Sequence, residues 1–100
     1  MPNFFISTFY HFFPLIDLDQ VKKDLEEIAQ KTDTLGLMII GAEGMNSTVA
    51  SSSEQGLAAF KANLQEHFKI EIHNFKDSTS QTPPFRRFSV KVREEIVTTG

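Results

Sequence analysis

Two groups of residues in this sequence have side chains suited to binding chemistry. One group surrounds a pair of glycines in the middle of the chain and consists of Glu43, Gly44, Asn46, Ser47 and Thr48. The other group is basic, lies in the last quarter, and consists of Lys76, Arg86, Arg87, Lys91 and Arg93. Lysine and arginine bind phosphate, and arginine also stacks on bases. The two groups therefore favour a surface that holds a nucleic acid or the backbone of a partner.

Both groups also have an ordinary structural interpretation. In a tight turn, Glu43 is simply solvated and Asn46 hydrogen-bonds its own backbone. A row of cations suits an exposed edge strand, because charge protects such a strand from aggregation. From the residues alone, both interpretations stay open.

The charge of the chain is unevenly distributed. The formal net charge is -3, but residues 1–75 carry five Lys/Arg against ten Asp/Glu, a balance of -5. Residues 76–100 carry five Lys/Arg against three Asp/Glu, a balance of +2. A basic segment on an acidic body is a local feature that the overall charge hides, and it is where a phosphate would be attracted.

Several kinds of chemistry find no support in the sequence. Zero cysteines exclude disulfides, thiolate metal sites and a cysteine nucleophile within these residues. The three histidines form no convincing metal-ligand set, and no flavin-type or nucleotide-type glycine motif occurs. We therefore expect no metal, no cofactor and no catalytic residue in residues 1–100. No apolar run approaches the roughly 18 residues of a membrane helix, and the start lacks a basic secretory segment, which predicts a cytoplasmic protein.

Hydrophobic periodicity predicts five strands and two helices. Alternation predicts strands over residues 4–12, 37–40, 45–50, 70–75 and 88–93, with a turn at 41–44 and a polar loop at 77–84. Apolar residues that recur every three or four positions predict a helix. It starts at a capping box formed by Asp17 and Gln20 and ends before Gly36. The same pattern predicts a second helix over residues 54–66, with Ser52 and Gln55 in the same box spacing.

This order predicts an α+β fold, the ferredoxin-like β-α-β-β-α-β sandwich with an additional C-terminal strand or tail, over residues 1–93. Two helices, each with one apolar stripe, cover only one face of the sheet. The other face is left for solvent, a ligand or a partner.

The residues around the predicted turn also resemble a known family. The run 42–50, followed in order by Lys76, Ser78, residues 84–87, residues 90–97 and Gly100, resembles the N-terminal domain of the rhodanese-containing tRNA uridine hydroxylases. Met45 stands in place of an isoleucine, and Ser47 and Ser51 stand where the family usually has glycine. The resemblance covers nearly all of this chain and the first part of such a protein.

The resemblance implies an acylphosphatase-like N-terminal domain followed by a rhodanese domain whose cysteine is needed for the reaction. Residues 94–100 are then the start of a linker toward that domain. Members of the family are implicated in oxygen-dependent conversion of the wobble uridine of certain tRNAs to 5-hydroxyuridine. For this chain the resemblance implies a domain that contacts tRNA through the basic residues, near the turn, and that does not hydroxylate alone.

Two other functions are open to this fold. One is an acylphosphatase-type hydrolase, but residues 11–16 are apolar and lack the glycine and arginine of a phosphate-cradling loop. The other is a non-catalytic interaction module that docks a second domain or a second copy through the uncovered sheet face.

Overall fold

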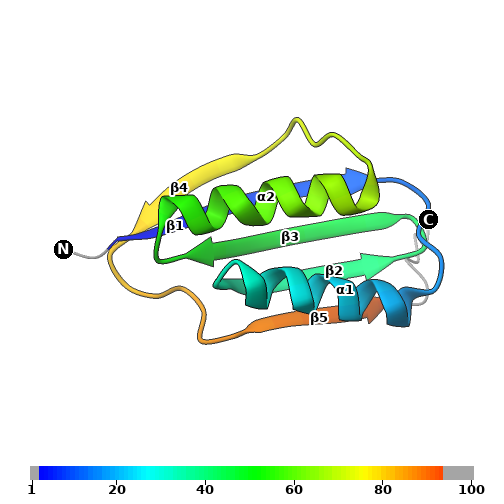
Figure 1. Cartoon of the computed structure of the whole chain (residues 1–100), viewed down its shortest axis with the longest axis horizontal. Helices are drawn as coiled ribbons and strands as arrows, with labels where there is room; N and C mark the ends of the chain where they lie inside the picture. Colours follow the sequence, from blue (N-terminus) through cyan, green and yellow to red (C-terminus); the bar gives the residue numbers. More distant parts are fainter. Residues whose placement is uncertain (1–2, 94–100) are drawn as a thin grey trace, which may run out of the picture.

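The computed structural model of the protein describes residues 3–93 as one sheet covered on one side by two helices (Figure 1). The elements are β1 (Phe4–Phe12), α1 (Leu18–Lys31), β2 (Thr34–Gly41), β3 (Gly44–Ser51), α2 (Glu54–Phe68), β4 (Lys76–Ser80) and β5 (Phe88–Arg93). The strand order is β4-β1-β3-β2-β5. Strand β5 runs parallel to β2, and the other pairs are antiparallel. The predicted ferredoxin-like α+β sandwich with an additional C-terminal strand is confirmed.

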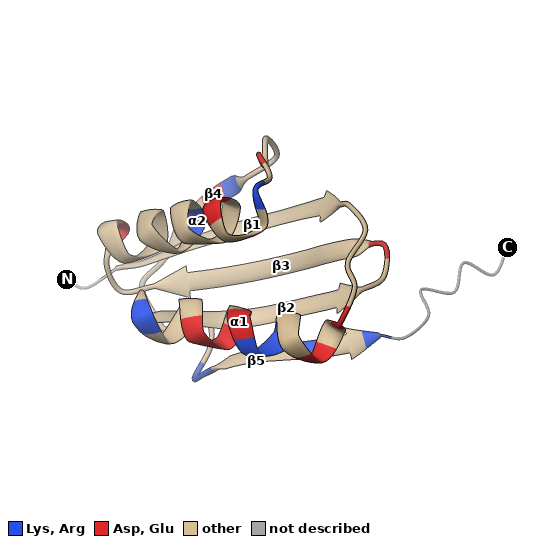
Figure 2. Cartoon of the chain, turned by 45° about the vertical axis from the view of Figure 1, so that its right-hand side comes forward, with Lys and Arg blue, Asp and Glu red and all other residues tan. Residues whose placement is uncertain are grey.

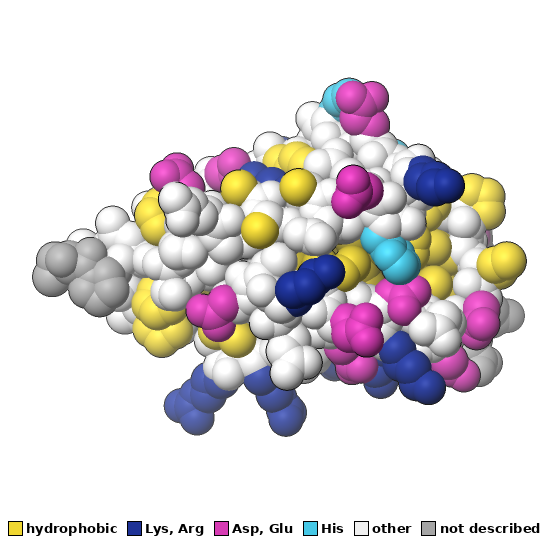
Figure 3. Space-filling view, viewed as in Figure 1, with side chains coloured by type: hydrophobic (Ala, Val, Ile, Leu, Met, Phe, Trp, Pro, Cys, Tyr) yellow, Lys and Arg dark blue, Asp and Glu magenta, His cyan; other side chains and the backbone are white. Residues whose placement is uncertain are grey.

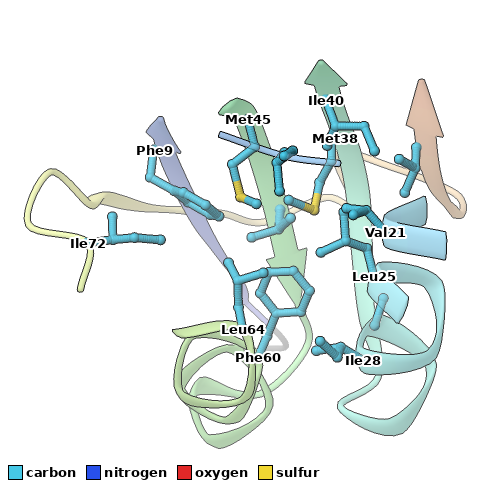
Figure 4. Close-up of a cluster of buried hydrophobic side chains, with 14 of the residues drawn as sticks. Phe9, Val21, Leu25, Ile28, Met38, Ile40, Met45, Phe60, Leu64 and Ile72 are labelled. Atoms are coloured by element: carbon cyan, nitrogen blue, oxygen red, sulfur yellow. The ribbon is translucent and has the colours of Figure 1, made fainter. Parts of the chain in front are cut away.

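The core lies between the sheet and the helices. Every second residue of each central strand points toward α1 and α2. These inward residues include the buried apolar side chains of the core (Figure 4) and four buried polar residues, Ser7, Thr34, Ser47 and Ser51. Phe9, Met38 and Val49 come from the sheet, and Leu25 and Phe60 come from the two helices. Because both helices use this one side, the opposite side of the sheet is uncovered, and we call it the open face. No helix within residues 3–93 is both long and apolar enough to cross a membrane.

The β2–β3 turn is tight and needs glycine. Gly41 pairs with Gly44, which leaves Ala42 and Glu43 as the two-residue loop. Gly44 has a φ of 147°, and a Cβ there would lie 2.3 Å from the carbonyl oxygen of His11, so only glycine fits. The predicted turn over residues 41–44 is confirmed.

The fourth strand differs from the prediction. Residues 70–75 are not a strand, and β4 begins at Lys76 and runs into the segment 77–84 predicted to be a polar loop. Side-chain amides take the place of backbone hydrogen bonds between strands here. Asn74 accepts a hydrogen bond from Tyr10 N at 3.0 Å and donates one to Tyr10 O at 2.7 Å. Gln65 Oε1 accepts from Ile72 N at 2.7 Å, which holds Ile72 in the core. The alternation that predicted a strand thus comes from an irregular segment tied down by amide side chains.

Both helix starts also differ from the predicted capping boxes. Asp17 precedes α1 with a left-handed φ of 54° and makes no side-chain cap. Gln20 donates instead to Asp24, at 2.9 Å. For α2 the cap is Ser53, one residue later than predicted, and its Oγ accepts from Gly56 N at 2.9 Å.

Gly36 does not end α1 as predicted. Asp33 takes the left-handed conformation after the helix, with a φ of 55°, and Gly36 lies inside β2. A Cβ on Gly36 would lie 2.3 Å from the carbonyl oxygen of Thr48. The glycine is needed there because β3 approaches closely.

Candidate nucleic-acid interface

The open face carries cations at both of its edges. Residues that lie opposite each other in neighbouring strands point to the same face. Lys76 on β4 pairs with Thr8, Thr8 pairs with Thr48, and the hydroxyl oxygens of the two threonines are 3.5 Å apart. At the other edge, Lys91 and Arg93 alternate with the buried Val90 and point outward. The three cations flank a face that also carries the outward-pointing Thr8 and Thr48.

The predicted basic residues do not form one cluster. Lys76 and Lys91 are separated by the width of the sheet, four spacings of about 4.8 Å, or about 19 Å. Lys91 and Arg93 alone are close neighbours on one face. The arrangement suits an extended ligand that crosses the strands rather than a single bound phosphate.

Arg86 and Arg87 lie at the far end of β5 from Arg93, about 20 Å away along the strand. Figure 2 shows basic positions both in the loop before β5 and at the end of this strand. The two arginines line a hollow at the end of α1 together with Glu26 and Asp33. These carboxylates oppose a phosphate, so this end of the molecule is less suited to RNA than the Lys91–Arg93 edge.

The central motif divides between the two faces of the sheet. Asn46 and Thr48 are on the open face, whereas Ser47 is buried on the helix side between Phe9 and Met38. The Ser47 hydroxyl has no hydrogen-bond partner among the described residues. Glu43 is exposed at the turn. Of the motif, Asn46 and Thr48 are therefore placed to touch a ligand on the sheet.

Two exposed aromatic residues belong to the same surface and were not among the predicted site residues. Tyr10 is 49% exposed and Phe12 is 73% exposed. Their ring centroids lie 5.4 Å apart. The alternation of residues 4–12 already puts Tyr10 on the outer face. The exposure of Phe12 follows from its position at the very end of β1, where no strand or helix covers it.

One ion pair joins the helix side to the edge strand. Lys61 Nζ on α2 lies 2.9 Å from Asp77 Oδ1 on β4. Burial alone would raise the pKa of Asp77, but the hydrogen bond and the charge of Lys61 outweigh it, and the pKa is lowered. The same lysine lies 4.6 Å from the centre of the Phe75 ring. This contact anchors β4 to the fold and leaves Lys76 free to face outward.

The loop between β1 and α1 is poorly suited to hold a phosphate. Phe13 N donates to Glu43 O at 3.0 Å, and Leu15 N donates to Ala42 O at 3.1 Å. Pro14 has no N–H to offer. Two backbone donors of this loop are therefore already used to pack it on the β2–β3 turn and are not available to an anion. Over residues 3–93, no three potential metal ligands come together.

An open-faced sandwich with this topology and a fifth strand beside β2 is the architecture of an acylphosphatase-like domain. The chain matches the UPF0176 acylphosphatase-like domain over residues 4–96 and belongs to that family. The acylphosphatase of Bacillus subtilis is similar in fold, with a TM-score of 0.54 over 93% of this chain and 100% of that one, at 16% identity.

Longer relatives carry a specific name. The tRNA uridine(34) hydroxylase of Bdellovibrio bacteriovorus is 47% identical over 98% of this chain and 28% of its own length. The tRNA uridine(34) hydroxylase of Agrobacterium fabrum is 32% identical over 98% of this chain and 31% of its own. The chain thus spans about 30% of the length of these relatives.

Proposed function

We propose that this domain is the N-terminal, tRNA-contacting part of an enzyme that hydroxylates the wobble uridine of tRNA to 5-hydroxyuridine in an oxygen-dependent reaction. The domain holds RNA on its open face, and the reaction takes place elsewhere in the enzyme. A rhodanese domain follows it in the chain, in the cytoplasm, and supplies the reactive cysteine that residues 1–100 lack.

One observation carries the RNA-contacting role. In the five strands of residues 3–93, the open-face positions include Lys76, Lys91 and Arg93 but no Asp or Glu. The acidic side chains of the sheet lie elsewhere: Asp77 points to the helix side and Glu43 is in the turn. The helix-covered face carries many acidic groups, most densely over α1 (Figure 3). On the open face, RNA phosphates therefore meet cations that no carboxylate of the strands opposes.

The test is titration of fluorophore-labelled tRNA into the 100-residue chain at several salt concentrations. Each phosphate contact releases counterions, so wild-type affinity falls steeply with salt. The variant Lys91→Ala/Arg93→Ala removes two contacts, and the slope of log affinity against log salt should become shallower by about two.

The matched control is Lys23→Ala/Lys31→Ala. It changes net charge equally but alters exposed residues of α1, on the helix-covered side. If the two variants bind equally, or if the wild type does not bind tRNA at low salt, the proposal is wrong. Comparison with Arg86→Ala/Arg87→Ala tells whether the loop before β5 contributes as well.

A second candidate is a protein-docking module, and the apolar content of the open face favours it. Ile6, Leu35, Leu37 and Ile39 point outward and are only half-buried. Such a surface suits a second domain or a second copy. In this case Leu37→Asp would abolish self-association measured by analytical ultracentrifugation, whereas the charge variants would have no effect.

A further inference from the structure

A hollow of about 610 Å³ opens at the end of the open face beside the β2–β3 turn. Its bottom is formed by Gly41 and Gly44, which are register partners and are themselves buried. In the same row of the sheet, Phe12 stands next to Gly44 on one side, and Arg93 stands next to Gly41 on the other. Two adjacent glycines thus leave a gap between an aromatic ring and a guanidinium group.

The wall on the β1 side is aromatic. Tyr10 and Phe12 point outward two residues apart, with their rings inclined by 49°. Both are exposed in a molecule whose other phenylalanines are largely packed into or against the core. Base stacking on such rings is favourable for every base, because each base has a π face.

The remaining walls supply hydrogen bonds and charge. Asn46 on β3 lies between its register partners Tyr10 on β1 and Ile39 on β2. Its exposed amide makes no hydrogen bond to another described residue. An amide can both donate to and accept from the edge of a base. Arg93 lines the hollow on the β5 side, and Lys91 lies just outside it, two residues earlier on the same face of β5, so a phosphate there would find two cations.

We propose that this hollow holds one unpaired nucleotide of an RNA. The base lies against Tyr10 and Phe12, its edge faces Asn46, and the backbone phosphate faces Lys91 and Arg93. The inference rests on the proposed tRNA-contacting function and adds the position and the kind of nucleotide. A duplex does not fit, because its bases are stacked on one another and its deep major groove keeps base edges from side chains. The size of the hollow also matches a small ligand.

The experiment compares two labelled RNAs of equal length, a single-stranded oligouridylate and a duplex, together with labelled tRNA, by fluorescence anisotropy. The variants are Tyr10→Ala and Phe12→Ala, with Tyr10→Phe as the conservative change. Ile16→Ala is the control, because Ile16 is 84% exposed and lies outside the hollow. Circular dichroism of each variant establishes that it is folded.

We expect the wild type to prefer the single strand. Each alanine variant should weaken single-strand binding by about tenfold, as for the loss of one stacking contact. Tyr10→Phe and Ile16→Ala should bind like the wild type. If tRNA binds but the alanine variants match Ile16→Ala, the nucleotide site is refuted while the tRNA-contacting function stands.

Two further outcomes would also decide the matter. If the wild type binds no RNA at low salt, the proposed function itself fails. If the chain forms a dimer that Phe12→Ala dissociates, and single-stranded RNA does not compete with it, the hollow binds a second copy and the nucleotide site is refuted.

Discussion

The two faces of this sheet are built from the same strands but differ in burial, and therefore in how much they stabilise the fold. On the helix side, Phe9, Met38 and Val49 are buried against α1 and α2, and removal of apolar surface from water stabilises the fold. On the open face, the alternate residues include Thr8, Tyr10 and Asn46, which are exposed and contribute little to packing. Burial on the helix side therefore supplies most of the stability, which leaves the open face available for binding.

The strongest test of this comparison replaces the same residue type on each side. Phe60→Ala removes a fully buried ring from the core, and we expect the free energy of unfolding to fall by about 3–5 kcal/mol. Phe12→Ala removes an exposed ring, and the change should stay within about 0.5 kcal/mol. Urea denaturation measures both. Equal losses would mean that the open face also supports the fold.

A second prediction concerns the close approach of the β2 and β3 backbones at Gly36. Gly36→Ala places a Cβ against the backbone of β3 at a φ of 141°, and we expect a loss on the order of 1–3 kcal/mol. Gly41→Ala, in the same strand, is the control and should cost less, because Gly41 is not among the positive-φ residues of the described chain. A tolerated Gly36→Ala would show that β3 can shift away.

The smallest expected effect comes from the ion pair at the sheet edge. Since the folded pKa of Asp77 is lowered, its stabilising effect is fully present above the ordinary value of 3.8 and disappears as the pH falls through the lower folded value. Asp77→Asn should therefore reduce stability at neutral pH by less than about 1 kcal/mol, since the pair is exposed at the carboxylate. Denaturation measured from pH 7 to pH 2 should show the difference in unfolding free energy between the wild type and Asp77→Asn disappear at low pH. A difference that stays constant would contradict the lowered pKa of Asp77.

Much of the fold could be predicted from the sequence because burial imposes periodicity. The alternation of residues 4–12 and 88–93 and the apolar stripes of both helices follow directly from one covered face. Residues 70–75 misled the prediction, because Asn74 and Gln65 replace ladder bonds with side-chain amides that no short-range pattern reveals. The predicted capping box of α1 was wrong because Asp17 adopts a left-handed conformation and makes no side-chain cap.

The candidate site could be predicted only in part. Lys91 and Arg93 share a face because they are two residues apart on a strand, and this much is local. The separation of Arg86 and Arg87 from that edge, and the width of the sheet between Lys76 and Lys91, depend on strand order. The gap over the glycine pair depends on register across four strands, which composition and spacing do not encode.

The most direct test of the central claim is methyl NMR of the isotopically labelled 100-residue chain during titration with tRNA at low salt. Leu37 and Ile39 report on the open face, and Ala58 on α2 reports on the helix-covered side. We predict that the open-face methyl signals shift in proportion to the bound fraction, while Ala58 stays unchanged. Shifts confined to methyl groups of α1 and α2, or no shifts under conditions where tRNA is bound, would contradict the account.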